Sequence, residues 1–136
     1  MAKFFYTIPD ELTRLLNSLG NIDDVAPKMI ESGLPIVQDE LVRRSEEHRD
    51  TGEMIASIKP TKTKKTDSGY VGVVRPTGKD SKGVRNMEKM AYLEYGTSVQ
   101  PPTPVLTPAV ASTEKKVVDT MQEVFNEEMW ITRWNS

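Results

Sequence analysis

Cysteine is absent from this chain of 136 residues, and only one histidine is present. Without cysteine the chain has no disulfide, no thiolate metal site and no cysteine nucleophile. The single histidine, His48, excludes a metal site built on a pair of histidines. No window approaches the roughly 20 apolar residues that cross a membrane, and the apolar residues 4–6, cut off by Pro9, do not read as a signal peptide. We therefore expect a protein that works in a cell interior, or in a particle assembled there.

Residues that could form a catalytic centre are equally scarce. His48 lies between Glu47 and Arg49 in a charged run, which is typical of a solvated side chain. The carboxylate pairs are sequence neighbours, and neighbours on a helix point about 100° apart, so they do not converge on a substrate. Residues 77–79 resemble the end of a phosphate-binding loop, but the first glycine of that motif is missing. The sequence therefore predicts no enzyme, no cofactor and no metal site.

Charge is distributed unevenly along the chain, although the net charge is only −2. Residues 1–58 hold six Lys or Arg against eleven Asp or Glu, residues 59–89 hold nine against three, and residues 90–136 hold three against six. A basic centre of this kind binds nucleic acid, pairs with acidic surfaces of neighbouring subunits, or simply keeps a hairpin solvated and blunts a sheet edge. The residues that could make such contacts are Lys62, Lys64, Lys65, Lys79, Lys82 and Arg85.

The whole chain, residues 1–136, is the size of one ordinary domain. Helices are predicted in its first third. Leucines at positions 12, 15, 16 and 19 share one helical face, and Gly20 is placed to end that helix. A second helix is predicted from Asp23, where acidic residues favour a helix start. Gly33 and Pro35 are expected to interrupt or kink this helix near Leu34.

The middle of the chain carries strand signals. The run YVGVV at residues 70–74 is the strongest strand pattern, and the tight turn before it predicts a β-hairpin over residues 58–75. Residues 76–89 are expected to form an exposed basic loop. Residues 90–95 form a short apolar run whose periodicity fits a strand or a helical turn, and we favour a strand that pairs with the hairpin.

Prolines mark the passage into the last element. The prolines within residues 96–108 indicate an extended linker, and a long helix is expected to start near Pro104 or Pro108. Its apolar stripe comprises positions 110, 117, 118, 121, 124 and 125, and the tail at 130–136 is expected to fray or dock. The predicted fold class is α+β: a small antiparallel sheet with a β-hairpin, packed by N-terminal helices and a long C-terminal helix.

Two segments carry a resemblance to a known family. Residues 92–98 read YLEYGTS and are followed by PPTPVLTPA at residues 101–109, while residues 51–58 read TGEMIASI. The pattern of Glu, an aromatic residue, Gly and Thr, then a proline-containing linker and a helix start, resembles the tail-completion proteins of long-tailed bacteriophages. The Thr-Gly and Ser-Ile pairs of residues 51–58 are similar to another landmark of that family. In chain order, residues 51–58 are the first landmark and residues 92–109 are the second. Members are also known as head–tail connector, minor tail or neck proteins.

The resemblance implies a structural virion subunit, assembled in the bacterial host cytoplasm. It implies a ring in the neck between the capsid portal and the tail tube, and a hexamer is the expected state because cyclic symmetry would follow the tail. Its partners would be connector or stopper proteins and the tail terminator or tube, with DNA passing through the channel. The same subunit could be a monomer in solution. The alternative from another class is a small nucleic-acid-binding or regulatory protein that uses the basic segment 59–89.

The physical properties of the second landmark suit a rigid junction. Gly96 fits a backbone that needs positive φ, and Thr97 can hydrogen-bond nearby backbone to fix the exit direction. Prolines then stiffen the link, so the C-terminal helix leaves at a defined angle. The junction residues predicted from both landmarks are Thr51, Gly52, Glu94, Tyr95, Gly96, Thr97, Pro104 and Pro108.

Overall fold

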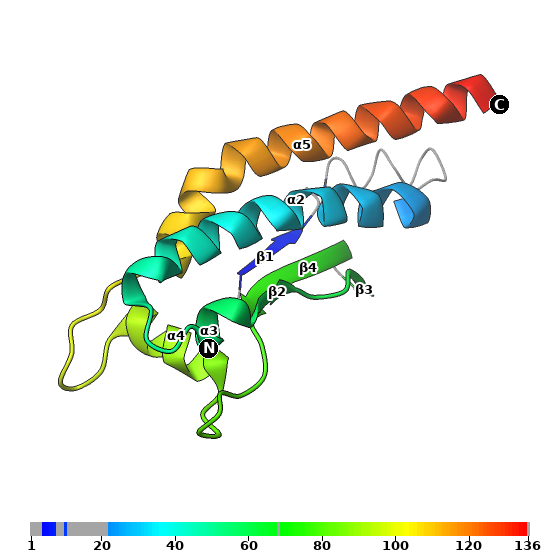
Figure 1. Cartoon of the computed structure of the whole chain (residues 1–136). Helices are drawn as coiled ribbons and strands as arrows, with labels where there is room; N and C mark the ends of the chain where they lie inside the picture. The colour runs from blue at the N-terminus through cyan, green and yellow to red at the C-terminus, as the bar shows by residue number, and fades with distance from the viewer. Residues whose placement is uncertain (1–3, 8–9, 11–21, 68, 136) are drawn as a thin grey trace.

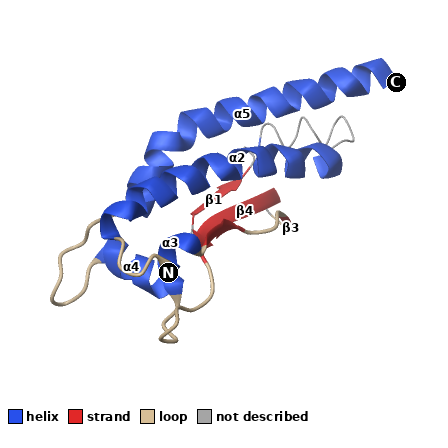
Figure 2. Ribbon diagram, viewed as in Figure 1, coloured by secondary structure: helices blue, strands red, loops and turns tan. Residues whose placement is uncertain are grey.

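The computed structural model describes residues 4–7, 10, 22–67 and 69–135. The helix predicted near residues 9–19 falls in the stretch 11–21, which lies outside the described residues. Helices and a small antiparallel sheet make up the described chain, and the fold class α+β is confirmed (Figure 2). No helix in the described part of the chain is long and apolar enough to cross a membrane.

The sheet is built around strand β4 (Gly69–Pro76). Strand β1 (Phe4–Thr7) pairs with it in antiparallel register, Phe4 opposite Val74. Strands β2 (Ile58–Pro60) and β3 (Lys64–Thr66) also pair with β4 in antiparallel register, β2 with its C-terminal end and β3 with its N-terminal end. The predicted hairpin is therefore confirmed, with its first arm divided into two short strands. Strand β1 was not predicted, because four residues are too few to show a period.

Helix α2 (Ile22–Ser45) runs without a break through Gly33 and Pro35, so the predicted interruption is wrong. Its buried face includes Met29, Ile30 and Leu41. The helix survives two internal prolines because it packs on the sheet on one side and on the C-terminal helix on the other. Gly33 belongs to that packing, since a Cβ there would lie 2.9 Å from Cγ1 of Val117.

The C-terminal helix α5 (Leu106–Asn135) lies along α2, on the side away from the sheet (Figure 1). It begins between the two prolines at which a start was predicted, and it includes the tail up to Asn135. Ala109, Thr113, Val117 and Met121 are buried at helical spacing. Val118, predicted for the apolar stripe, is 54% exposed, because its position one residue after Val117 turns it by about 100°.

Residues 90–95 are helical, so the strand predicted there is wrong. They belong to helix α4 (Asn86–Tyr95), whose buried residues Met87, Met90 and Glu94 follow helical spacing of three and four. The loop was predicted over residues 76–89, but it ends at residue 85, because residues 86–89 form the first turn of α4. The remaining loop, 77–85, is largely exposed as expected. Two short helices, the 3-10 helix η1 (Glu46–His48) and α3 (Glu53–Ala56), connect α2 to the sheet.

Two substitutions in α2 should have opposite effects on stability. Pro35 is exposed and removes one backbone hydrogen bond, so Pro35→Ala should raise the free energy of unfolding by about 1–2 kcal/mol. Gly33→Ala improves helix propensity by roughly 1 kcal/mol, but its methyl group meets Val117, so we expect a net loss of about 1–2 kcal/mol. Denaturant unfolding measures both, and a gain for Gly33→Ala would contradict the close approach of α2 and α5.

Candidate functional site

Glu94 is the central residue of the junction between α4 and α5. Its side chain is 7% exposed and lies at the start of α5. The backbone N–H groups of Val105 and Leu106 donate to its Oε2, both at 2.8 Å. The N–H and the hydroxyl of Thr107 donate to its Oε1, at 3.1 and 2.5 Å. One carboxylate from α4 therefore satisfies backbone donors that the first turn of α5 leaves free.

The charge of this carboxylate is favoured where it lies. Burial alone raises the pKa of Glu94, but the hydrogen bonds from Thr107, Val105 and Leu106 together outweigh burial, and the pKa is lowered. The positive end of the helix dipole favours the same ionised form. Glu94 is thus an ionised cap that couples the orientation of α5 to that of α4.

The loop between the two helices closes tightly at Gly96. This glycine has φ of 76° and ψ of 178°, a conformation that is essentially restricted to glycine. A Cβ there would lie 2.8 Å from the backbone nitrogen of Pro102 and 2.9 Å from the carbonyl oxygen of Gln100. The hydroxyl oxygen of Thr97 accepts from the N–H of Gln100 at 3.1 Å, and the Thr97 N–H donates to the Gln100 carbonyl at 2.9 Å. The loop is therefore held by backbone contacts as well as by prolines.

The two prolines predicted for the junction lie on either side of the α5 start. Pro104 is exposed and precedes the first helical residue by two positions. Pro108 lies in the first turn, where a missing N–H costs nothing. The N–H of Thr103 donates to the carbonyl of Leu93 at 2.7 Å, so the chain returns to α4 just before α5 begins.

The same landmark also presents apolar groups to solvent. Tyr92 and Tyr95 are 47% and 64% exposed and lie three residues apart, so they are neighbours on one side of α4. Val99, in the following loop, is 93% exposed. We call Tyr92, Tyr95 and Val99 the junction surface. Glu94 points inward, whereas the side chains of the junction surface point outward. The second landmark therefore fixes the start of α5 and also exposes side chains to solvent.

The first landmark forms the start of α3. Gly52, at φ of 86°, precedes the helix, and the hydroxyl oxygen of Thr51 accepts from the Glu53 N–H at 3.3 Å. The Glu53 carboxylate in turn accepts from the N–H and the hydroxyl of Ser81, at 3.0 and 3.2 Å. Thr51 and Gly52 therefore position a carboxylate that holds the exposed loop 77–85 against α3.

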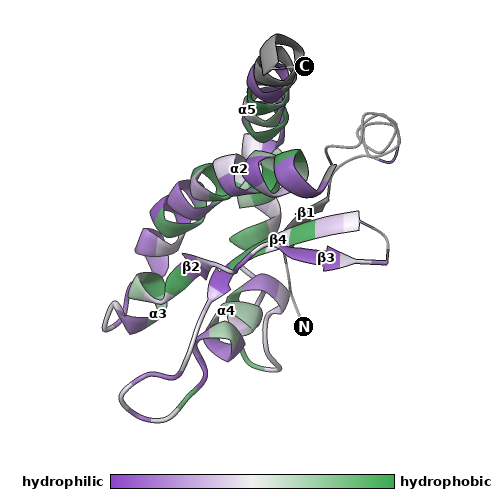
Figure 3. Ribbon diagram, turned by 90° about the vertical axis from the view of Figure 1, so that its right-hand side faces the viewer, coloured by the Kyte–Doolittle hydropathy of each residue, from purple (hydrophilic) through white to green (hydrophobic). Residues whose placement is uncertain are grey.

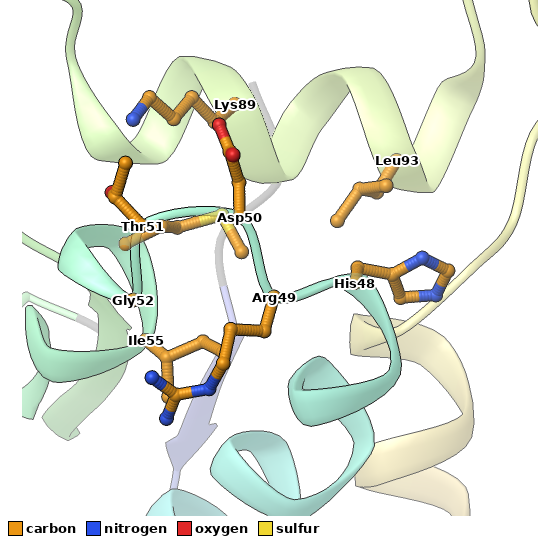
Figure 4. Close-up of a pocket in the computed structure, with 9 residues that line it drawn as sticks. His48, Arg49, Asp50, Thr51, Gly52, Ile55, Lys89 and Leu93 are labelled. Carbon is orange, nitrogen blue, oxygen red and sulfur yellow. The ribbon is translucent and has the colours of Figure 1, made fainter.

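The two landmarks meet at a shallow pocket between α3 and α4 (Figure 4). Thr51, Gly52 and Leu93 line it together with His48 and Lys89. Two of the charged groups around it have partners elsewhere: Lys89 pairs with Asp80, and Arg49 pairs with Glu46 at 2.7 Å. Among the residues the structure describes, no group of three His, Cys, Asp or Glu side chains is placed to hold a metal ion.

The six basic residues singled out by the sequence lie in three places. Lys62, Lys64 and Arg85 lie together beside strand β4, around the half-exposed Val71 and Val73. Lys65 lies on the opposite side of the sheet, where it pairs with Asp23 at 3.0 Å. The remaining two, Lys79 and Lys82, are exposed in the loop 77–85.

Two further cations complete the first group. Arg75 lines the same surface, and Lys59 lies opposite Arg75 in the sheet register. We call Lys59, Lys62, Lys64, Arg75 and Arg85 the basic face. The alternation of residues along β4 could have revealed Arg75, because Val71, Val73 and Arg75 follow one another at every second position. Lys65 is separated from Lys64 by the same alternation.

Comparison with known proteins gives one family. A family model described as "Bacteriophage HK97-gp10, putative tail-component" matches residues 10–96. No curated protein matches the chain. No solved structure matches it either. The matched range includes the first landmark, the whole hairpin and α4 with Glu94, while the loop after Gly96 and helix α5 follow it.

Removing the Glu94 carboxylate should destabilise the fold. Glu94→Ala leaves buried N–H groups of α5 without acceptors, and we expect a loss of about 2 kcal/mol in the free energy of unfolding. Because the folded pKa is lowered, the contribution of this group is present above the unfolded pKa of about 4.5 and is lost as pH falls through the folded pKa. Glu94→Gln should therefore show a shallower loss of stability on acidification. Glu88→Gln, on the exposed side of α4, is the control, and equal effects of the two changes would contradict the capping role.

The Gly96 turn gives a second test of the junction. Gly96→Ala places a methyl group against the backbone of residues 100–102 in a conformation that only glycine adopts readily, so we expect a loss of about 2–3 kcal/mol. Gly78→Ala is the matched control, since Gly78 also has positive φ but has no atom within 4 Å of the added carbon. It should cost about 1 kcal/mol. Thermal or denaturant unfolding compares the two, and a cheaper Gly96→Ala would show that the tight turn is not required.

Proposed function

Because the chain belongs to the HK97-gp10-like family of bacteriophage tail components, we propose that it is a structural subunit of the neck or the head-proximal end of the tail. In this role it completes the tail and joins it to the head through protein–protein contacts. The observation that carries the proposal is the junction: a buried carboxylate fixes the long helix α5 to α4 while the junction surface stays exposed.

A ring subunit needs this kind of rigidity, because every copy must present the same faces to its neighbours. The Glu94 cap and the Gly96 turn fix how α5 leaves the rest of the fold. Exposed tyrosines on a fixed helix suit an interface, since they bury a large area and lose little conformational entropy. We therefore assign the junction surface to contacts with a neighbouring neck or tail protein, such as a connector, stopper, terminator or tube protein.

The assembled form that we propose is a ring of six copies in the virion, following the cyclic symmetry of the tail. The chain is assembled in the host cytoplasm and stays monomeric in dilute solution until its partners are present. This role uses no cofactor and no catalysis. The predicted junction residues, from Thr51 and Gly52 to Pro104 and Pro108, act as structural residues in it, through helix starts and turns.

Deleting the gene from its phage tests the proposal. We expect tails and filled heads to accumulate separately, with a loss of infectious particles that a plasmid copy of the gene restores. Electron microscopy and plaque counts measure this outcome. Normal particles with joined heads and tails after the deletion would contradict a role in the neck.

The junction surface has its own test in the same complementation assay. Tyr92→Ser combined with Tyr95→Ser should fold like the wild type, because both side chains are about half exposed or more. It should nevertheless fail to restore joined particles. Val118→Ser is the control, since Val118 is a comparably exposed apolar residue on α5. Full complementation by the tyrosine variant would remove the junction surface from the interface.

A further inference from the structure

One face of the sheet is left uncovered by α2. Tyr70 and Val74 are buried on the α2 side of β4, whereas Val71, Val73 and Arg75 are half-exposed on the other side. Figure 3 shows α2 and α5 on one side of the sheet and hydrophobic residues along β4. The five cations of the basic face surround the two valines. An apolar centre with a charged rim is the usual anatomy of a protein–protein interface.

Within the described part of the chain, the cations of the basic face form no ion pair, although other cations of the chain do. Lys65, one residue from Lys64 but on the covered side, pairs with Asp23. Five cations gathered on one surface repel each other, so an anionic partner there would lower the energy.

Helix α5 carries a matching set of anions. Asp119, Glu123 and Glu127 are exposed and spaced by four residues, so they form one ridge roughly 12 Å long. We call these three residues the acidic ridge. Like charges four residues apart destabilise a helix, and none of the three pairs with a cation among the described residues. Lys115 and Lys116 precede the ridge on the same helix and are likewise exposed and without an ion pair there.

Glu40 shows how a carboxylate of this chain behaves when it is paired. Hydrogen bonds from Arg43 and Arg44, at 2.5 and 2.8 Å, hold it on α2 and lower its pKa to about 2. It also lies 3.4 Å from the hydroxyl of Ser112, so it connects α2 to α5. No residue that the structure describes pairs in this way with the carboxylates of the acidic ridge.

The basic face and the acidic ridge lie at opposite ends of the layered fold. The order is sheet, then α2, then α5, and the views in Figures 1 and 3 agree on it. The ridge residues are exposed, whereas Val117 and Met121 of the same helix are buried. One copy therefore cannot bring the two surfaces together, but two copies stacked head to tail can. Repetition of such a contact gives a closed ring if the rotation between copies closes.

We propose that the basic face of one copy docks on the acidic ridge of α5 of a second copy, and that this contact builds the ring. The inference rests on the proposed function and names the surfaces that join the subunits. Charge complementarity favours a second copy, because the same chain carries both halves. The apolar centre at Val71 and Val73 favours a protein over nucleic acid, since a phosphate backbone offers these side chains nothing to pack against.

Paired charge reversals test the contact. One variant reverses the basic face (Lys62→Glu, Lys64→Glu, Arg75→Glu), and a second reverses the ridge (Asp119→Lys, Glu123→Lys, Glu127→Lys). Each places like charges together, and we expect the association constant between copies to fall at least about 100-fold. Neither should complement the gene deletion by itself. Expressed together they should complement, because every contact between the two different variants is again between opposite charges. A chain carrying all six changes should also complement.

The control reverses three cations outside the basic face: Lys79→Glu, Lys82→Glu and Lys115→Glu. It should complement like the wild type. All variants change exposed or half-exposed side chains, and circular dichroism with thermal unfolding checks that each is folded. If both reversals complement as well as the wild type, the docking contact is wrong while the neck role stands. If the deletion itself has no effect on particles, the proposed function fails instead.

Nucleic acid is the competing partner and has a distinct signature. Loss of function in the basic-face variant that the ridge variant does not rescue, together with salt-dependent duplex DNA binding that only the basic-face variant loses, would overturn the proposal in favour of DNA.

Disulfide crosslinking tests the docking contact directly, because the chain has no cysteine of its own. Lys62→Cys combined with Glu123→Cys should give an oxidative ladder of multimers in assembled particles, and each single change should give none. A double variant that stays monomeric would also overturn it.

Discussion

The orientation of the C-terminal helix depends on one buried carboxylate. Glu94 accepts four hydrogen bonds from residues 105–107, where α5 begins. The chain between the two helices packs tightly, because a Cβ at Gly96 would lie within 3 Å of residues 100 and 102. A buried charge is tolerated here because helix donors and the helix dipole replace the water it has lost. All 30 residues of α5 come after this contact in the chain, so a change at Glu94 would alter the orientation of the whole helix.

Helix α2 is the second constraint, because it is the layer that the sheet and α5 share. Two glycines allow the layers to approach: a Cβ at Gly72 would lie 2.6 Å from Ile30, and one at Gly33 would lie 2.9 Å from Val117. This packing also explains why α2 contains prolines without breaking. Stabilisation by tertiary contacts on two sides exceeds the local cost of the missing hydrogen bonds.

Charge segregates across these layers. The sheet side gathers cations that form no ion pair with the described residues, while α5 exposes carboxylates in a row. Helix α2 between them pairs its charges, within the helix as Glu40 with Arg43 and across to α5 as Lys28 with Glu128. A fold that pairs some of its charges internally and leaves two complementary sets exposed is suited to assembly with identical copies. The junction surface, which lies apart from both sets in the sequence, leaves room for contacts with a different protein. The neck role that we propose needs both kinds of contact.

The sequence by itself determined the α+β class, the hairpin around β4, the long C-terminal helix and the family, because strong periodicity and two short motifs carry those properties. Tertiary structure decided what local patterns leave ambiguous. Residues 90–95 became helical because burial of Met90 and Glu94 follows a helical period, and Gly33 became a contact point because α5 packs against it. The role of Glu94 as a cap of α5 could not be predicted from local sequence, since its partners lie 11 to 13 residues away. Strand alternation alone separates Lys64 from Lys65, because alternate residues of a strand face opposite sides. Only the pairing of the strands brought Arg75 beside Lys62, because the two residues are distant in the sequence.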